Sequence, residues 1–210
     1  MINQDNSRVF LGHVINGSLE QGLLVKVDSG TNIEDIQVGT PVTIDGQSKR
    51  FFGYITDMRL EWANQELQDI TTVAQTPEVT QTIVETSTYS VIKVRPVVII
   101  AGDAASLLDG PEIAKTIPPH LSRVYQASAE DVSYVFGNED GRHIWIGSPL
   151  ALESAQVCLN LEQFVKRSNG IFGKSGTGKS FLTRILLAGI VQKDIAVNLV
   201  FDMHNEYGWQ

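Results

Sequence analysis

The first hundred residues alternate between short apolar stretches and clusters of turn-forming residues. The turn clusters are "NGS" at 16–18, "DSGTN" at 28–32 and "DGQ" at 45–47. The apolar stretches between them are "VFLGHVI" (9–15), "LLVKV" (23–27), "PVTI" (41–44) and "RFFGYITDMRLEW" (50–62). Short strands at this spacing predict a small antiparallel β-barrel, because a closed sheet leaves no unpaired edge.

The next two segments extend this β pattern. Residues 71–90 are rich in Thr, Gln and Val, which favours a hairpin or excursion from the barrel. "VIKVRPVVIIAG" (91–102) predicts a buried strand that returns to the barrel. Pro96 lacks the backbone N–H that a sheet interior needs, so it indicates an edge or a bulge in that strand.

The pattern loosens from 103 to 136, where several prolines predict a connecting segment. Within it, "SAEDVSYVFG" (128–137) has the features of a short helix. Ser128 is its expected N-cap, two acidic residues lie in the first turn, and Gly137 ends it. "RHIWIG" (142–147) predicts one further strand.

A different order of elements follows. "NGIFG" (169–173) predicts a strand, "KSFLTRILLAGIVQK" (179–193) a buried helix, and "IAVNLVF" (195–201) a parallel strand. We therefore expect a mixed fold, a small antiparallel β-barrel followed by an incomplete α/β P-loop (RecA-like) domain. The expected division is a barrel domain at 1–102, a connecting segment at 103–140 and the N-terminal part of the P-loop domain at 141–210.

Charge and composition restrict the possible partners. The net charge is −8, but residues 166–210 carry six basic and three acidic side chains. The acidic remainder is a poor general nucleic-acid surface, because neutralising phosphates dominates that affinity. The apolar runs are too short to span a membrane, the polar N-terminus lacks a signal pattern, and Cys158 is the single cysteine. These features predict a cytoplasmic protein without a membrane partner.

The loop "GKSGTGKS" (173–180) fits G-x-x-x-x-G-K-[ST] at every fixed position. Its glycines allow the backbone N–H groups to curl around phosphates, at the positive end of the following helix. Lys179 supplies a cation, and the Ser180 hydroxyl is the expected Mg²⁺ ligand. A loop that only turned a strand into a helix would need no lysine. ATP with Mg²⁺ is the predicted cofactor, and the predicted binding residues are Gly173, Lys174, Ser175, Gly176, Thr177, Gly178, Lys179, Ser180 and Phe181.

A second candidate element is "LVFDMHNEYG" (199–208), an apolar stretch that ends in Asp202. Asp202 is a candidate to hold Mg²⁺ through water, although apolar strands that end in aspartate are common. Glu206 is a candidate base that activates water, together with Lys179 as a catalytic residue. The alternative is that Glu206 only pairs within its loop.

These stretches together resemble the HerA-type ATPases, relatives of the FtsK translocases among the P-loop proteins. The barrel part resembles that family in "LGHVINGSLEQGLLVKVD", "VGTPVTIDG" and "FFGYITDM", and the connecting part in "IPPHLSRVYQASAEDVSYVFG". "IWIGSPL" and "VCLNLEQFVKRSNGIFGKSGTGKSFLTRILLAGI" resemble the entry to the family's motor domain. "DMHNEYG" matches its D-x-H-x-E-Y element.

The resemblance implies a homo-hexameric ring that threads double-stranded DNA, with ATP hydrolysis at subunit interfaces. It also implies a partner nuclease or effector that docks near the barrel, in DNA end processing or phage defence. The family's metal-binding acidic strand lies further downstream, which argues against Asp202 in that role. Since 30 residues follow Ser180, we expect these 210 residues to be a fragment that binds nucleotide weakly and does not hydrolyse it.

Two alternatives stay open. One is a related ring ATPase that translocates protein, as in type IV secretion. The other is an interaction module whose nucleotide site switches assembly. The three readings differ in whether ATP is turned over and whether DNA stimulates that turnover.

Overall fold

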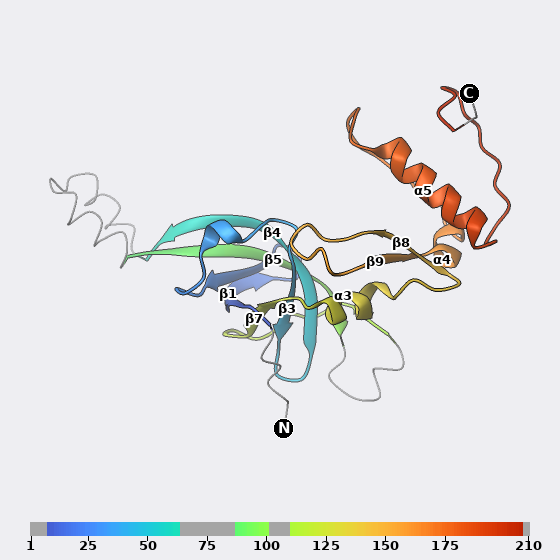
Figure 1. Ribbon diagram of the computed structural model, residues 1–210. Coiled ribbons are helices and arrows are strands. Elements are labelled where there is room, and N and C mark those ends of the chain that lie inside the picture. The colour runs from blue at the N-terminus through green and yellow to red at the C-terminus, as the bar shows by residue number, and fades with distance from the viewer. Residues whose placement is uncertain (1–7, 64–86, 101–109, 208–210) are drawn as a thin grey trace.

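The computed structural model describes residues 8–63, 87–100 and 110–207. Its first part is a closed barrel of six antiparallel strands in the order β2-β1-β7-β3-β4-β5, with β2 also paired to β5. Figure 1 shows this barrel beside a smaller unit of helices and one hairpin. The barrel strands are β1 (Phe10–Ser18), β2 (Gly22–Val27), β3 (Pro41–Asp45), β4 (Arg50–Trp62), β5 (Thr88–Ile100) and β7 (Arg123–Gln126). The short strand β6 (Glu112–Ile113) extends the sheet from β5, and a 3-10 turn, η1 (Ile33–Asp35), precedes β3.

The barrel expected from the alternation of apolar and turn residues is confirmed. Each of the five predicted strands forms, but the strand that closes the ring was not expected. β7 comes from the segment that the sequence indicates as a connection, and it pairs with both β1 and β3. The predicted excursion at 71–90 lies mostly outside the described residues.

Pro96 lies at an irregularity in the sheet, as its missing N–H predicts. The register between β4 and β5 shifts between Phe52 and Gly53, where Gly53 faces Pro96. A Cβ atom on Gly53 would lie 2.2 Å from the carbonyl oxygen of Arg95. The two strands approach so closely here that only glycine fits.

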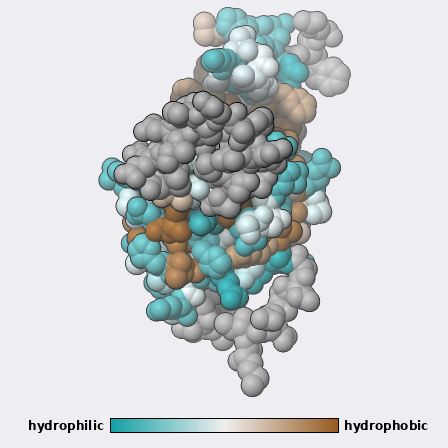
Figure 2. Space-filling view, turned by 90° about the vertical axis from the view of Figure 1, so that its left-hand side faces the viewer, coloured by the Kyte–Doolittle hydropathy of each residue, from teal (hydrophilic) through white to brown (hydrophobic). Residues whose placement is uncertain are grey.

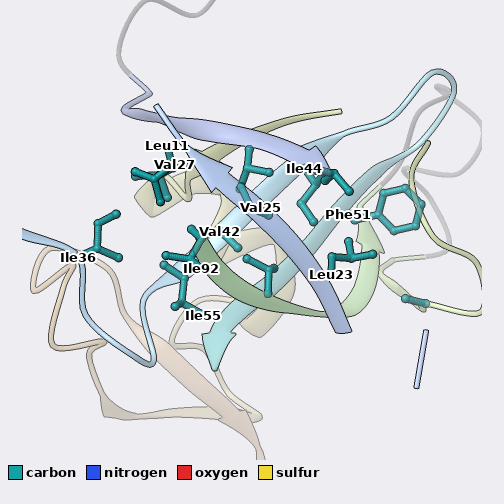
Figure 3. Close-up of a cluster of buried hydrophobic side chains, with 14 residues drawn as sticks. Leu11, Leu23, Val25, Val27, Ile36, Val42, Ile44, Phe51, Ile55 and Ile92 are labelled. Carbon is teal, nitrogen blue, oxygen red and sulfur yellow. The ribbon is translucent and has the colours of Figure 1, made fainter. Parts of the chain in front are cut away.

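The barrel interior is a continuous apolar core (Figure 3). Side chains from opposite strands meet there because inward and outward positions alternate along each strand. The fully buried members include Val25, Val42, Ile44, Ile92, Val94 and Val124. Outside the barrel, polar and apolar side chains are mixed on the face that Figure 2 presents.

Helix α3 (Ala129–Phe136) packs on the outside of the barrel. The predicted cap is confirmed, since Ser128 and Asp131 form a reciprocal capping box and Gly137 ends the helix. The buried Asp131 carboxylate also pairs with Arg50 of β4, at 3.0 Å. Phe52, 1% exposed, lies on the same outer face of β4 and packs edge-on against Phe136. Burial and an ion pair thus join α3 to the barrel.

The second unit contains a hairpin and two helices. Strands β8 (His143–Gly147) and β9 (Val157–Asn160) pair antiparallel, and β9 leads directly into α4 (Leu161–Val165). Helix α5 (Lys179–Gln192) forms as predicted and lies over the hairpin in Figure 1. None of the helices in the described ranges is long and apolar enough to span a membrane.

The parallel strands expected for an α/β domain are absent from the described residues. Both 169–173 and 195–201 are irregular, so the predicted β-α-β order is wrong at its two strands. Strand backbone needs hydrogen bonds from a neighbouring strand, and no described strand pairs with either segment. Most apolar side chains there are exposed, with Phe172 at 93% and Phe201 at 88%, whereas Ile171 is half-buried. The described residues therefore do not confirm the α/β P-loop domain of the predicted fold, because they contain no parallel sheet.

Candidate functional site

The scaffold of the candidate site is the contact between α5 and the β8–β9 hairpin. Leu186 and Ile190 of α5 pack on Ile144 of β8 and Leu161 of α4. A Cβ atom on Gly189 would lie 2.6 Å from the Ile144 side chain. The missing side chain thus lets the helix backbone lie directly on the hairpin, which fixes the C-terminal half of α5 relative to the rest of the unit.

The turn before β8 also supports the C-terminal end of α5. The Lys193 ammonium donates to the backbone carbonyl of Asp140, at 2.7 Å. The Asp140 carboxylate accepts hydrogen bonds from the backbone N–H of Arg142, and from the ring and backbone N–H of His143. These bonds favour the charged carboxylate and lower the pKa of Asp140 from 3.8 to about 2.

The Asp140 carboxylate makes the stability of the folded protein depend on pH in the acid range. Because the pKa is depressed in the folded protein, the contribution is complete above the ordinary value of 3.8 and is lost as the pH falls through about 2. We expect Asp140→Asn to lower the melting temperature at neutral pH, with a difference from the unmodified protein that shrinks towards pH 2. Thermal unfolding followed by circular dichroism at stepwise pH measures this. Glu139→Gln is the matched control, and a difference independent of pH would contradict the assignment.

The glycine-rich loop precedes α5 and has the backbone that the sequence predicts. Gly176 and Gly178 adopt positive φ angles of 81° and 86°, which side chains disfavour. A Cβ atom on Gly173 would lie 2.6 Å from Thr177 Oγ1. Gly178 occupies the N-cap of α5 without a side-chain hydrogen bond, so the start of the helix carries no side-chain cap. The loop therefore forms a tight turn that ends at the positive pole of a 14-residue helix.

Two side chains close the loop on itself. The Lys179 ammonium and the Thr177 hydroxyl both donate to the carbonyl oxygen of Lys174, each at 2.7 Å. Lys179 is thus turned back over the loop rather than extended into solvent. The Lys174 side chain is exposed, as is Phe181 at 68%.

The second predicted element meets the loop at Ser180. The Ser180 hydroxyl donates to the Glu206 carboxylate at 2.5 Å. Asp202 organises the turn, since its two carboxylate oxygens accept from the backbone N–H groups of Glu206 (3.0 Å) and Tyr207 (2.8 Å). The structure therefore brings Glu206 to Ser180, the residue that follows Lys179, and it uses Asp202 to hold the turn that presents Glu206.

One contributor to this arrangement was not anticipated from the sequence. Arg184 donates to the backbone carbonyl of Glu206, and its guanidinium lies over the Tyr207 ring, 6.0 Å from the centroid. The signal was present in the spacing, because Arg184 follows Ser180 by four residues and so lies on the same face of α5.

The remaining described surface offers no competing metal centre. No group of three His, Cys, Asp or Glu side chains is placed to hold a metal ion among the residues that the structure describes. Two hollows of about 800 and 490 Å³ lie on the barrel, away from the loop. The glycine-rich loop with its Ser180–Glu206 contact is therefore the best-defined candidate site.

Comparison with known proteins gives a family match over the part of the chain that contains this loop. Residues 144–210 match the family model described as the central domain of helicase HerA. A probable helicase of Methanocaldococcus jannaschii is 31% identical over 146 residues, which cover 69% of this chain and 27% of the relative. The DNA double-strand break repair helicase HerA of Pyrococcus furiosus is 31% identical over 84 residues, 40% of this chain and 15% of the relative.

The matched segments therefore span about a quarter or less of each relative's length. The family match begins within β8 and includes the glycine-rich loop, α5 and the Asp202–Tyr207 turn. Residues 144–210 therefore belong to the family of the HerA central domain, and the chain is similar to HerA-type helicases over the matched segments.

Proposed function

We propose that the protein is the ATP-binding subunit of a HerA-like ring ATPase, a DNA translocase or helicase that binds ATP and Mg²⁺ at residues 173–181. The observation that carries this proposal is the form of the loop at the start of α5. Its left-handed glycines and the uncapped helix start suit a phosphate group, which backbone N–H groups and a helix dipole stabilise.

The side chains at the loop fit the same ligand. The Lys179 ammonium is already directed over the loop, and a phosphate oxygen is a stronger acceptor than the Lys174 carbonyl that it now contacts. Ser180 offers hydroxyl lone pairs to Mg²⁺ while its proton is donated to Glu206. When bound, Mg²⁺ would neutralise the charge that develops on the phosphates. Glu206 is the candidate base, and Asp202 is assigned to the turn instead of to direct contact with Mg²⁺.

The proposed substrate and partners follow from the relatives. One relative is named a helicase of double-strand break repair, which supports double-stranded DNA as the polymer threaded by a homo-hexamer. The acidic charge outside residues 166–210 suits a protein contact better than a grip on DNA. We therefore assign the barrel to docking a partner nuclease or effector, in end processing or phage defence, and the complete assembly to the cytoplasm.

The test is ATP turnover by the complete gene product with and without linear double-stranded DNA. Strong stimulation by DNA is expected, because a translocase couples hydrolysis to movement along its track. Turnover that is indifferent to DNA would overturn the translocase and favour a protein-translocating ring. Nucleotide binding without any turnover would favour an assembly switch.

A further inference from the structure

The turn at 202–207 is attached to α5 at two points one helical turn apart. Ser180 and Arg184 are four residues apart, so their side chains leave the same face of the helix. Ser180 donates to the Glu206 carboxylate, whereas Arg184 donates to the backbone carbonyl of the same residue. The side chain and the backbone of Glu206 are therefore held by two different residues of α5.

Asp202 holds the same turn from within. Its carboxylate accepts from the N–H groups of Glu206 and Tyr207, so the backbone of Glu206 is bonded on both its N–H and its carbonyl side. The Arg184 guanidinium also covers the Tyr207 ring. A turn that merely packed on the helix would not need three separate polar contacts to orient one residue.

We propose that Arg184 and Asp202 are positioning residues that hold the Glu206 carboxylate against the Ser180 hydroxyl and thereby strengthen the Mg²⁺-dependent part of nucleotide binding. This inference rests on the proposed function, because it concerns the same loop. A hydroxyl that donates its proton to a carboxylate keeps a fixed orientation and leaves its lone pairs for a cation. Groups that orient a metal ligand in this way commonly change metal affinity by about 10- to 100-fold.

The first readout is the affinity of the complete gene product for ADP in Mg²⁺ and in EDTA. We expect Glu206→Gln to reduce the ratio of the two affinities about tenfold, and Arg184→Gln and Asp202→Asn to reduce it in the same direction. Arg184→Lys should reduce the ratio less than Arg184→Gln does, since an ammonium can still donate to the Glu206 carbonyl. Arg167→Gln and Asp194→Asn are matched controls at exposed positions, and neither should change the ratio.

A double variant separates positioning from general stability. If Arg184 acts through Glu206, Arg184→Gln should have no further effect on the ratio in a Glu206→Gln background. Equal reductions in both backgrounds would overturn the proposal, as would a lowered melting temperature with an unchanged ratio.

The second readout needs no nucleotide. Hydrogen exchange should show protected amides at Glu206 and Tyr207, and Asp202→Asn and Arg184→Gln should speed their exchange. Rapid exchange of both amides in the unmodified protein would overturn the positioning role. Absence of ADP binding in both solutions would instead overturn the proposed function, and with it the Mg²⁺ effect. Binding with an unchanged ratio in every variant would overturn only this inference.

Discussion

Replacing Lys179 by alanine is expected to lower ATP turnover by the complete gene product by about 100-fold or more, as loss of a group that stabilises transition-state charge commonly does. The Lys179 ammonium is bonded to the Lys174 carbonyl inside the glycine-rich loop, 2.7 Å away. An alanine leaves that position without a cation, and the bound phosphates lose a charged donor. Turnover and ATP affinity, measured on the same preparation, check the expectation.

Two further variants sharpen this result. Lys166→Ala removes an exposed lysine at the end of α4 and should leave turnover unchanged. Lys179→Arg keeps the charge but replaces a compact ammonium by a larger planar group, so turnover should stay low. Unchanged turnover in Lys179→Ala would contradict the assignment of residues 173–181 as the nucleotide site.

The largest expected change in stability comes from Phe52→Ala, which we expect to lower the free energy of unfolding by about 3–5 kcal/mol. Phe52 is 1% exposed and packs edge-on against Tyr54 and Phe136, between the barrel and α3. Alanine would leave a cavity in the apolar cluster that joins these parts. Urea unfolding followed by tryptophan fluorescence and circular dichroism measures the change.

The matched control for Phe52→Ala is Phe172→Ala. The Phe172 side chain is 93% exposed, so its removal takes no buried surface from the fold. We expect its unfolding midpoint to remain close to that of the unmodified protein. If Phe52→Ala were as mild as Phe172→Ala, the packing of α3 on the barrel would contribute little to stability.

The barrel strands could be predicted because their determinants are local. Alternating apolar positions end at turn clusters such as "DGQ", and the interior accepts any apolar side chain of suitable size. The cap of α3 was predictable for the same reason, since Ser128 and Asp131 bond within a single turn. β7 was missed because only Val124 of its four residues is fully buried, and because Pro118 and Pro119 precede it. Its identity as a strand comes from its neighbours β1 and β3.

The candidate site also has parts that could be predicted from the sequence and parts that could not. The loop motif is a run of consecutive residues whose spacing reports its backbone, so Lys179 and Ser180 could be named from the sequence. The segments 169–173 and 195–201 were wrongly predicted to be strands. Apolar composition indicates a buried strand only when a neighbouring strand supplies hydrogen bonds. Arg184 was missed because its partner is a backbone carbonyl, so its spacing from Ser180 indicates the shared face of α5 but not the contact with Glu206.

The place of β7 in the ring also sets the order in which the molecule can fold. β1 and β3 are made early, yet each has β7 as its neighbour on one side, and β7 is synthesised after the whole β4–β5 ribbon. Until residue 126 has left the ribosome, β1 and β3 each present an unpaired edge, the kind of surface on which partly made chains associate wrongly. Closure by a late, distant strand also makes barrel formation slow compared with the local helices, because loop entropy is lost before the contacts form. The early barrel strands are thus exposed to quality control for as long as synthesis takes to reach β7.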